Sequence, residues 1–419
     1  MKLLKLILVF TILSSAFSSC MKDNCKTKAR MFFPIYKTRE VLLGEVKLLA
    51  PKSIEKAGKI FSYGNYLFIN EIDKGIHVID NSNAVNPNKI GFLNITGNLD
   101  LWVKNNLLYA DCYDNLLVLD IKNILDIKLL ETLPKVFPER SYNGAQMDET
   151  KGYVIGWIER DTTLTVECNS NGYGHGREDY MLQTMDKSSF AVNLSSSGSN
   201  GFAPPSGVAG SLTRFNVTGN YLYCVDHSYI HSFNISSQKP VKSGDVDLGW
   251  GVETIYSFNN NLFIGTSTGV LIYSLSNPAM PSYTNKMQHV RTCDPVITDG
   301  QYAFLTLRGG SACGGFTNQL DVLNVSDLKN IKLLKSYALT SPYGLGMDNS
   351  YVFICDDGYG IRVFNRADVM LMNEVKKIEI THPRDIIVLN NTLLIMAESK
   401  MLQYDYSNIN EIKFISEIK

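Results

Sequence analysis

Carboxylates recur beside short apolar runs throughout this 419-residue chain, and carboxylates commonly bind cations or act as general acids and bases. Those that flank the apolar runs are Glu71, Asp100, Asp111, Asp226, Glu253, Asp294, Asp356, Asp385 and Glu398. The arginines interleaved with them are Arg214, Arg291, Arg308 and Arg384. Gathered on one surface, such residues could form a polar pocket for a sugar, a peptide or a cation. For most of them we favour the alternative that they are solvated strand ends that form ion pairs between neighbouring parts of the fold.

Catalysis by these carboxylates is the less favoured hypothesis. A glycosidase needs two carboxyl groups about 5 to 9.5 Å apart, and a sequence does not give that separation. We therefore assign no catalytic residue, and the interpretation leans away from an enzyme. The six histidines are scattered, and no CxxC or Cys–His pair has metal-binding spacing, so the sequence predicts neither a metal nor a cofactor. A net charge of -1 argues against nucleic acid as a partner.

The elements that position the charged residues repeat along the chain. Apolar residues alternate with a period of two, which is typical of half-buried strands. The pattern recurs around Leu67, Leu108, Val154, Leu222, Leu262, Ala303, Val352 and Leu393, at spacings of 41, 46, 68, 40, 41, 49 and 41 residues. In most units the next strand along the chain ends in Asp or Asn, as in Leu116–Asp120. Because such a side chain can accept hydrogen bonds from amides two or three residues on, we interpret it as a turn former.

Units of about 40 to 45 residues with four short strands and no helical pattern indicate propeller blades. The sequence therefore predicts an all-β propeller of about eight four-stranded blades over residues 57–419. Seven blades is the alternative, because the third unit contains Gly152–Glu159 but no clear Asx-ended strand after it. The pattern in Leu116–Ile121 resembles the LVIVD-repeat family of bacterial surface proteins. That resemblance implies the repeat architecture and no single biochemistry.

The propeller topology converts sequence positions into faces. The start of each inner strand and the loop after the second strand lie on one face, so the charged residues would rim that face. The candidate binding rim comprises Glu71, Asp111, Asp226, Asp294, Arg308, Asp356, Arg384 and Asp385. An insertion of about residues 160–210, rich in Gly, Ser and Asn, follows the second strand of the third unit. For this insertion, disorder or capping is favoured over ligand binding.

Two cysteines fall on the same face of one blade, Cys293 at the start of an inner strand and Cys313 in the loop after the second strand. An exported compartment is oxidising, so we predict a disulfide between them, with two buried thiols as the alternative. Cys112, Cys224 and Cys355 fall within second strands and are predicted to be small core residues.

Residues 1–19 are predicted to be a signal peptide. A basic start precedes an apolar run from Leu6 to Leu13, which is too short to span a bilayer of about 30 Å. Phe17-Ser18-Ser19-Cys20 then resembles a bacterial lipobox. The resemblance implies cleavage before Cys20 and attachment of lipid to that residue. An ordinary secreted protein with a cysteine near its cleavage site is the alternative.

The residues after Cys20 bear on its destination. Met21 stands where an Asp would indicate retention at the inner membrane, and Lys22-Asp23 is similar to the export signal of Bacteroidetes surface lipoproteins. Residues 20–56 would then form a lipid-anchored tether and a lead-in strand. We expect an outer-membrane lipoprotein exposed at the cell surface, with a periplasm-facing orientation as the alternative.

The sequence therefore favours a binding or interaction module in the cell envelope. Its expected partners are the membrane, through the lipid at Cys20, and a glycan or an envelope protein. One alternative is a propeller-fold carbohydrate-active enzyme, a glycoside hydrolase or lyase, that uses acidic residues at the channel mouth. A second alternative is a structural scaffold of the envelope.

Overall fold

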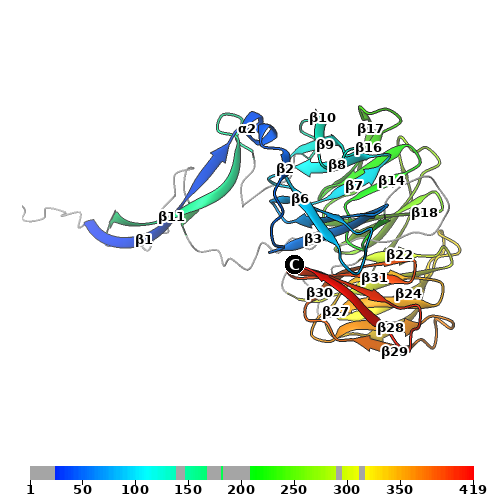
Figure 1. The fold of residues 1–419 in the computed structure, drawn as a ribbon. Helices are drawn as coiled ribbons and strands as arrows, with labels where there is room; N and C mark the ends of the chain where they lie inside the picture. The colour runs from blue at the N-terminus through cyan, green and yellow to red at the C-terminus, as the bar shows by residue number, and fades with distance from the viewer. Residues whose placement is uncertain (1–23, 138–146, 168–180, 183–207, 289–294, 311–316) are drawn as a thin grey trace, which may run out of the picture. The chain divides into compact units, whose positions relative to one another are not determined.

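The computed structural model describes residues 24–137, 147–167, 181–182, 208–288, 295–310 and 317–419. The chain divides into two compact units, each described here by itself. Unit 1 comprises Met1–Tyr36 and Val154–Ser189, and unit 2 comprises Lys37–Tyr153 and Phe190–Lys419. Most elements of both units are β-strands (Figure 1).

Unit 1 contains a three-stranded sheet. Strand β1 (Asn24–Lys37) lies between β11 (Tyr153–Glu167) and β12 (Met181–Leu182). Arg30 on β1 forms an ion pair with Glu159 on β11 at 2.9 Å. The third sequence unit, around Val154, is therefore part of this sheet and not a propeller blade. An alternating apolar pattern specifies a strand but not its partner, so the sequence alone suggested an extra blade.

Unit 2 is a propeller whose described residues form seven blades, the alternative count. Blades 1 to 3 consist of β3 (Ala57–Tyr63), β4 (Tyr66–Glu71), β5 (Gly75–Asp80), β6 (Asn88–Asn94); β7 (Leu101–Lys104), β8 (Leu107–Cys112), β9 (Asn115–Asp120), β10 (Lys128–Leu133); and β14 (Phe215–Thr218), β15 (Tyr221–Val225), β16 (Tyr229–Asn234), β17 (Val241–Asp247). Blades 4 and 5 consist of β18 (Val252–Phe258), β19 (Asn261–Thr266), β20 (Gly269–Ser274), β21 (Ser282–Gln288); and β22 (Val296–Thr298), β23 (Tyr302–Leu307), β24 (Gln319–Asn324), β25 (Lys332–Ala338). Blades 6 and 7 consist of β26 (Pro342–Met347), β27 (Tyr351–Asp356), β28 (Gly360–Asn365), β29 (Asn373–Ile378); and β30 (Pro383–Leu389), β31 (Thr392–Ala397), β32 (Lys400–Asp405), β33 (Lys413–Ile418).

Blade 1 carries two additional strands. Strand β13 (Val208–Ala209) pairs with the inner strand β3, and β2 (Lys47–Leu49) pairs with the outer strand β6. Helix α2 (Arg39–Gly44) precedes β2. Arg39 donates from Nε to the Tyr153 hydroxyl and from Nη2 to Asp114 of blade 2, both at 3.1 Å. These hydrogen bonds attach helix α2, near the start of unit 2, and Tyr153, the last residue before the chain returns to unit 1, to blade 2.

Turn chemistry explains the regular hairpins of the blades. Asn105 and Asn106 connect β7 to β8 with φ angles of 51° and 59°, the left-handed conformation that two-residue hairpin turns require and Asn tolerates. At the end of each third strand the predicted Asx turn is confirmed. Asp80, for example, accepts a hydrogen bond from the N–H of Ser82 at 2.8 Å, and Ser274 replaces Asx in blade 4 with a hydrogen bond of 3.2 Å.

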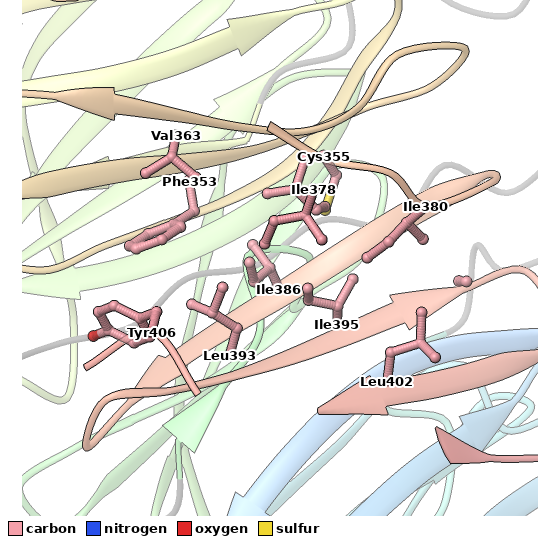
Figure 2. Packing of buried hydrophobic residues seen from close by; sticks show 12 residues of the cluster. Phe353, Cys355, Val363, Ile378, Ile380, Ile386, Leu393, Ile395, Leu402 and Tyr406 are labelled. Carbon is pink, nitrogen blue, oxygen red and sulfur yellow. The ribbon is translucent and has the colours of Figure 1, made fainter. Parts of the chain in front are cut away.

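The apolar cores lie between neighbouring blades. Figure 2 shows Phe353 and Cys355 of blade 6 packed against Leu393 and Ile395 of blade 7. Cys112, Cys224 and Cys355 are buried, as predicted. Burying a large aliphatic side chain contributes roughly 1.5–3 kcal/mol, so these layers hold each blade to the next.

The ring closes without a shared strand, because the four main strands of each blade are consecutive in the chain. Blade 7 lies beside blade 1, where β30 and β31 contact β3 (Figure 1). Ile387 and Met396 pack there against Ile60. Gln403 and Asn81 exchange two side-chain hydrogen bonds of 2.7 and 3.0 Å across the closure. Noncovalent packing between complete blades therefore closes the ring.

Candidate functional site

The central channel of the propeller has two ends. At the start end the inner strand of each blade begins, and at the turn end it turns into the second strand. The sequence placed the candidate rim at the start end. The described residues show a different distribution of charge and space between the two ends.

Four carboxylates of the predicted rim cap the backbone below the surface of the start end. Glu71, Asp111, Asp226 and Asp356 lie at the ends of second strands, and each is 0% exposed. The Asp356 carboxylate accepts hydrogen bonds from the N–H groups of Thr340 at 3.0 Å and Ser341 at 2.6 Å. Buried polar groups require such partners, which corrects the expectation that these carboxylates form an exposed rim.

Three of these carboxylates also pair with a basic side chain on the third strand of the same blade. The pairs are Glu71–His77 at 3.0 Å, Asp226–His231 at 3.1 Å and Asp356–Arg362 at 2.8 Å. Each basic residue is the third residue of its strand. The sequence carries a signal for these pairs, a basic residue within an apolar strand, although the predicted rim includes none of the three basic residues.

The environment of Asp226 shows the electrostatic effect of such a pair. Burial raises the pKa of this carboxyl group, but hydrogen bonds from His231 and from the N–H groups of Ser228 and Tyr229 outweigh burial and lower the pKa to about 2. Asp226 therefore stays ionised and bound to its partners. A carboxylate held in this way stabilises the fold and is not poised as a general acid.

Residues 208–214, here called the axial segment, connect the insertion to blade 3 through the channel. The segment hydrogen-bonds to blades 1, 2, 4, 6 and 7 at Ile60, Asp100, Ile255, Leu345 and Asp385. The Ser211 side chain links two blades, because its Oγ donates to Asp385 at 3.1 Å and accepts from the N–H of Leu345 at 2.6 Å. A segment can contact the inner strands of five blades only where it lies on the axis of the propeller. The axial segment therefore fills the channel at this level.

Asp385 meets the axial segment in a buried charge cluster and is itself 0% exposed. Its Oδ1 accepts hydrogen bonds from the N–H groups of Ser211 at 2.7 Å and Ile386 at 2.9 Å. Burial raises the pKa of Asp385 to about 7. Lys59 lies 3.5 Å from Asp100, and burial lowers the pKa of Lys59 to about 8. The axial segment and the buried side chains bonded to it, here called the seal, close the channel at this level. Asp385 belongs to the seal and not to an exposed rim.

Arg308 and Arg384 are the members of the predicted rim that the structure brings together. Their guanidinium groups lie on the ring of Tyr343, with Cζ at 4.0 and 4.2 Å from the ring centroid. Arg384 also donates to Asp357 at 2.9 Å, and His382 contacts the same carboxylate at 2.9 Å. Burial lowers the pKa of the Arg308 guanidinium. This cluster places paired charges and stacked side chains at the start end of blades 5 to 7.

A cavity of about 210 Å³ opens at the turn end. Val208 and Ala209 of the axial segment line it, together with the inner strands of blades 4 to 7. Phe258, Met347 and Val388 contribute apolar walls. The polar residues at the cavity are Thr298, Asp299, Asp348, Asn349 and Arg366. This cavity could not be predicted from the sequence, because apolar inner-strand ends carry no signal that separates a cavity wall from ordinary core.

Several predicted features lie outside the described residues. They are the signal peptide at 1–19, the lipidation site Cys20, the Cys293–Cys313 disulfide, Asp294 and most of the insertion. Where the structure is described, no group of three or more His, Cys, Asp or Glu residues could hold a metal ion. The helical segments among those residues are also too short or too polar to cross a bilayer.

Solved structures with a similar fold support the architecture. The computationally designed Ika8 protein matches with a TM-score of 0.51 and 10% identity, over 89% of this chain and 90% of its own. A protein from Lactobacillus plantarum matches with a TM-score of 0.52 and 11% identity, over 86% of this chain and 98% of its own. At such low identity the likeness concerns the fold alone. Together with the blades described above, it defines the chain as a seven-bladed β-propeller.

The sequence alone identifies no related protein. No model of a known protein family matches the chain, and a search of curated proteins finds no match.

Proposed function

We propose that this propeller is a lipid-anchored binding module of the LVIVD-repeat type in the outer envelope of a bacterium, and that it binds an envelope protein or a glycan at the turn end. The observation that carries the proposal is the cavity of about 210 Å³ framed by the inner strands of four blades. Inner strands packed on both sides are rigid, and binding sites are commonly concave, preformed and largely apolar. The lipobox-like residues ending at Cys20 support the anchor and the envelope location.

The arrangement of carboxylates favours binding over catalysis. At the cavity, Asp299 is ion-paired with Arg366, and Asp348 accepts hydrogen bonds from the N–H groups of Ser350 and Tyr351, both at 2.7 Å. Asp385 has the raised pKa expected of a general acid but is sealed from solvent. A hydrolase would need two carboxyl groups facing the substrate. The alternatives of a carbohydrate-active enzyme and of an envelope scaffold are outcomes of the experiments below.

The anchor is tested by substitution of the proposed lipidation site. Cys20→Ala should move the protein from the membrane fraction to the soluble fraction and abolish incorporation of a palmitate analogue. Cys25→Ala, five residues further along, is the matched control and should behave like the wild type. Unchanged fractionation of Cys20→Ala would contradict the lipid anchor. Protease added to intact cells should digest a surface-exposed protein and spare a periplasm-facing one.

The binding role is tested with soluble protein that lacks residues 1–20. We expect a screen of immobilised envelope glycans and purified outer-membrane proteins to yield binding that Asn349→Trp weakens at least tenfold. Val241→Trp is the matched control, because Val241 is 60% exposed on the outer strand of blade 3. Binding that Asn349→Trp leaves unchanged would move the site away from the turn end. Absence of any ligand would favour the scaffold, and turnover of a bound glycan would favour the enzyme.

A further inference from the structure

We propose that the turn-end cavity accepts a single aromatic ring whose polar substituent is neutral or positively charged. The inference rests on the proposed binding role and narrows it to one ligand chemistry. The ring could belong to a free small molecule or to a Tyr side chain on a partner protein, and the experiment below separates these sources.

The size of the cavity sets the size of the ligand. An engineered cavity of about 150 Å³ with aliphatic and aromatic walls binds benzene, whereas pockets for drug-sized ligands span about 300–1,000 Å³. At about 210 Å³, the turn-end cavity fits one substituted ring. An oligosaccharide would exceed this space.

The walls favour an aromatic ring over a polar group of the same size. Tyr256 and Phe258 line one side with nearly parallel rings, at a centroid distance of 6.5 Å and an interplanar angle of 8°. Met347 contributes a thioether, and both ring edges and sulfur atoms make favourable contacts with a further ring.

The polar groups that border the interior already have partners within the protein. The Tyr256 hydroxyl donates to the carbonyl of Thr298 at 2.9 Å, and the Thr298 hydroxyl donates to the carbonyl of Tyr302 at 2.7 Å. A ligand therefore gains little from placing its own polar groups deep in the cavity. Burial of apolar surface is the main favourable contribution that these walls offer.

The mouth of the cavity determines the charge of the substituent. Two carboxylates, Asp299 and Asp348, stand there beside one guanidinium, that of Arg366. The Arg366 guanidinium is already bound within the protein, because it forms an ion pair with Asp299 and donates to the carbonyl of Asp348 at 2.9 Å. The excess of negative charge repels a ligand carboxylate and attracts a hydroxyl or ammonium donor.

The test compares three ring compounds of similar shape, p-cresol, 4-methylbenzylamine and 4-methylbenzoate, by saturation-transfer NMR titration of the soluble protein. For so small a contact we expect Kd values of roughly 1 mM for the first two, and binding of the benzoate at least tenfold weaker. Val388→Phe, which fills the cavity, should abolish binding of p-cresol, and Val241→Phe should not. Equal or tighter binding of the benzoate, or p-cresol binding that survives Val388→Phe, would overturn the proposal.

A second variant tests the proposal independently, in case Val388→Phe fails to fold. Asp299→Asn removes one carboxylate from the mouth without filling the cavity. It should reduce the preference for 4-methylbenzylamine over 4-methylbenzoate at least threefold, and an unchanged preference would contradict the assigned role of the mouth.

A capped Gly-Tyr-Gly peptide distinguishes the two sources of the ring. Binding as tight as that of p-cresol supports a partner side chain, and binding of p-cresol alone supports a free small aromatic. If a glycan or envelope protein binds at Asn349 while none of the ring compounds binds, the aromatic inference fails and the binding role stands. If the ring compounds bind but the envelope screen is empty, the proposed envelope ligand fails instead.

Discussion

The two ends of the propeller channel differ in charge and in free space. A ligand site is usually sought among charged residues, but here most of the buried charged residues and the cavity lie at opposite ends. The start end holds most of the ionisable residues of the interior, yet Glu71, Asp111, Asp356 and Asp385 are buried and hydrogen-bonded there. The turn end has largely apolar walls and retains an open cavity. In this ring the buried charges of the start end hold strand ends and loops in place, whereas the space for a ligand lies between apolar strand ends, with charged residues only at its mouth.

The strongest test of this comparison removes a cap from the start end. Asp356→Ala should lower the free energy of unfolding by about 3–5 kcal/mol, because it leaves Arg362 without its buried carboxylate partner. It also frees the N–H groups of Thr340 and Ser341. Urea unfolding followed by tryptophan fluorescence measures the change. Asp405→Ala, which removes an exposed turn carboxylate of blade 7, is the control and should cost about 1 kcal/mol or less. Equal losses would show that Asp356 is not a structural cap.

Gly344 and Gly346 lie on the same inner strand, β26, so the same substitution at each of them compares the stability of the two ends. A Cβ at Gly344 would lie 2.5 Å from Asp385 Oδ1 and 2.7 Å from Ser211 Oγ, inside the seal. A Cβ at Gly346 would lie 2.7 Å from a Val388 methyl group, beside the cavity. We expect Gly344→Ala to destabilise the protein by about 1–3 kcal/mol and Gly346→Ala by less, because Val388 can move into free space. Thermal unfolding of both variants measures the difference, and the reverse order would contradict the assignment of seal and cavity.

The sequence predicted the fold well because the fold depends on local and repeated chemistry. Asp80 and its equivalents form the expected turns, and the Asn-rich hairpins follow from the left-handed conformation that Asn tolerates. The count of blades needed nonlocal information. Tyr153–Glu167 alternates like the second strand of a blade but pairs with β1, which lies more than 100 residues earlier in the chain.

The site was less predictable, for a different physical reason. The topology correctly brings Asp356, Arg384 and Asp385 to the start end, but burial decides whether a charged residue there meets solvent or a backbone N–H group. That burial depends on the axial segment. Residues 208–214 carry no motif that announces their passage through the channel, and their polar members Ser211 and Thr213 are typical of loops. The arrangement depends on contacts with five blades, which no local pattern encodes.

The pH dependence of stability probes the seal. The folded pKa of Asp385 is raised to about 7 from 3.8, so its stabilising contribution is complete below about pH 4 and is lost as pH rises through about 7. Lys59, with a folded pKa of about 8, is charged in both states at lower pH and contributes no slope there. Between pH 5 and 7.5 the wild type should therefore lose about 1 kcal/mol or more relative to Asp385→Asn. Parallel stability profiles of the two proteins, measured by urea unfolding, would contradict the buried titration.

The smallest predicted effect concerns the stacked cluster of Arg308, Tyr343 and Arg384 at the start end. Tyr343→Leu removes two cation–aromatic contacts, each worth about 0.5–1 kcal/mol at a partly exposed site, while retaining apolar bulk, so we expect a loss of about 1 kcal/mol. Tyr343→Phe keeps the ring and should match the wild type in thermal unfolding. Since Tyr343 lies at the opposite end from the cavity, Tyr343→Leu should leave p-cresol binding unchanged. A loss of that binding would mean that the axial segment couples the two ends, and the seal would then act on the ligand site instead of merely closing the channel.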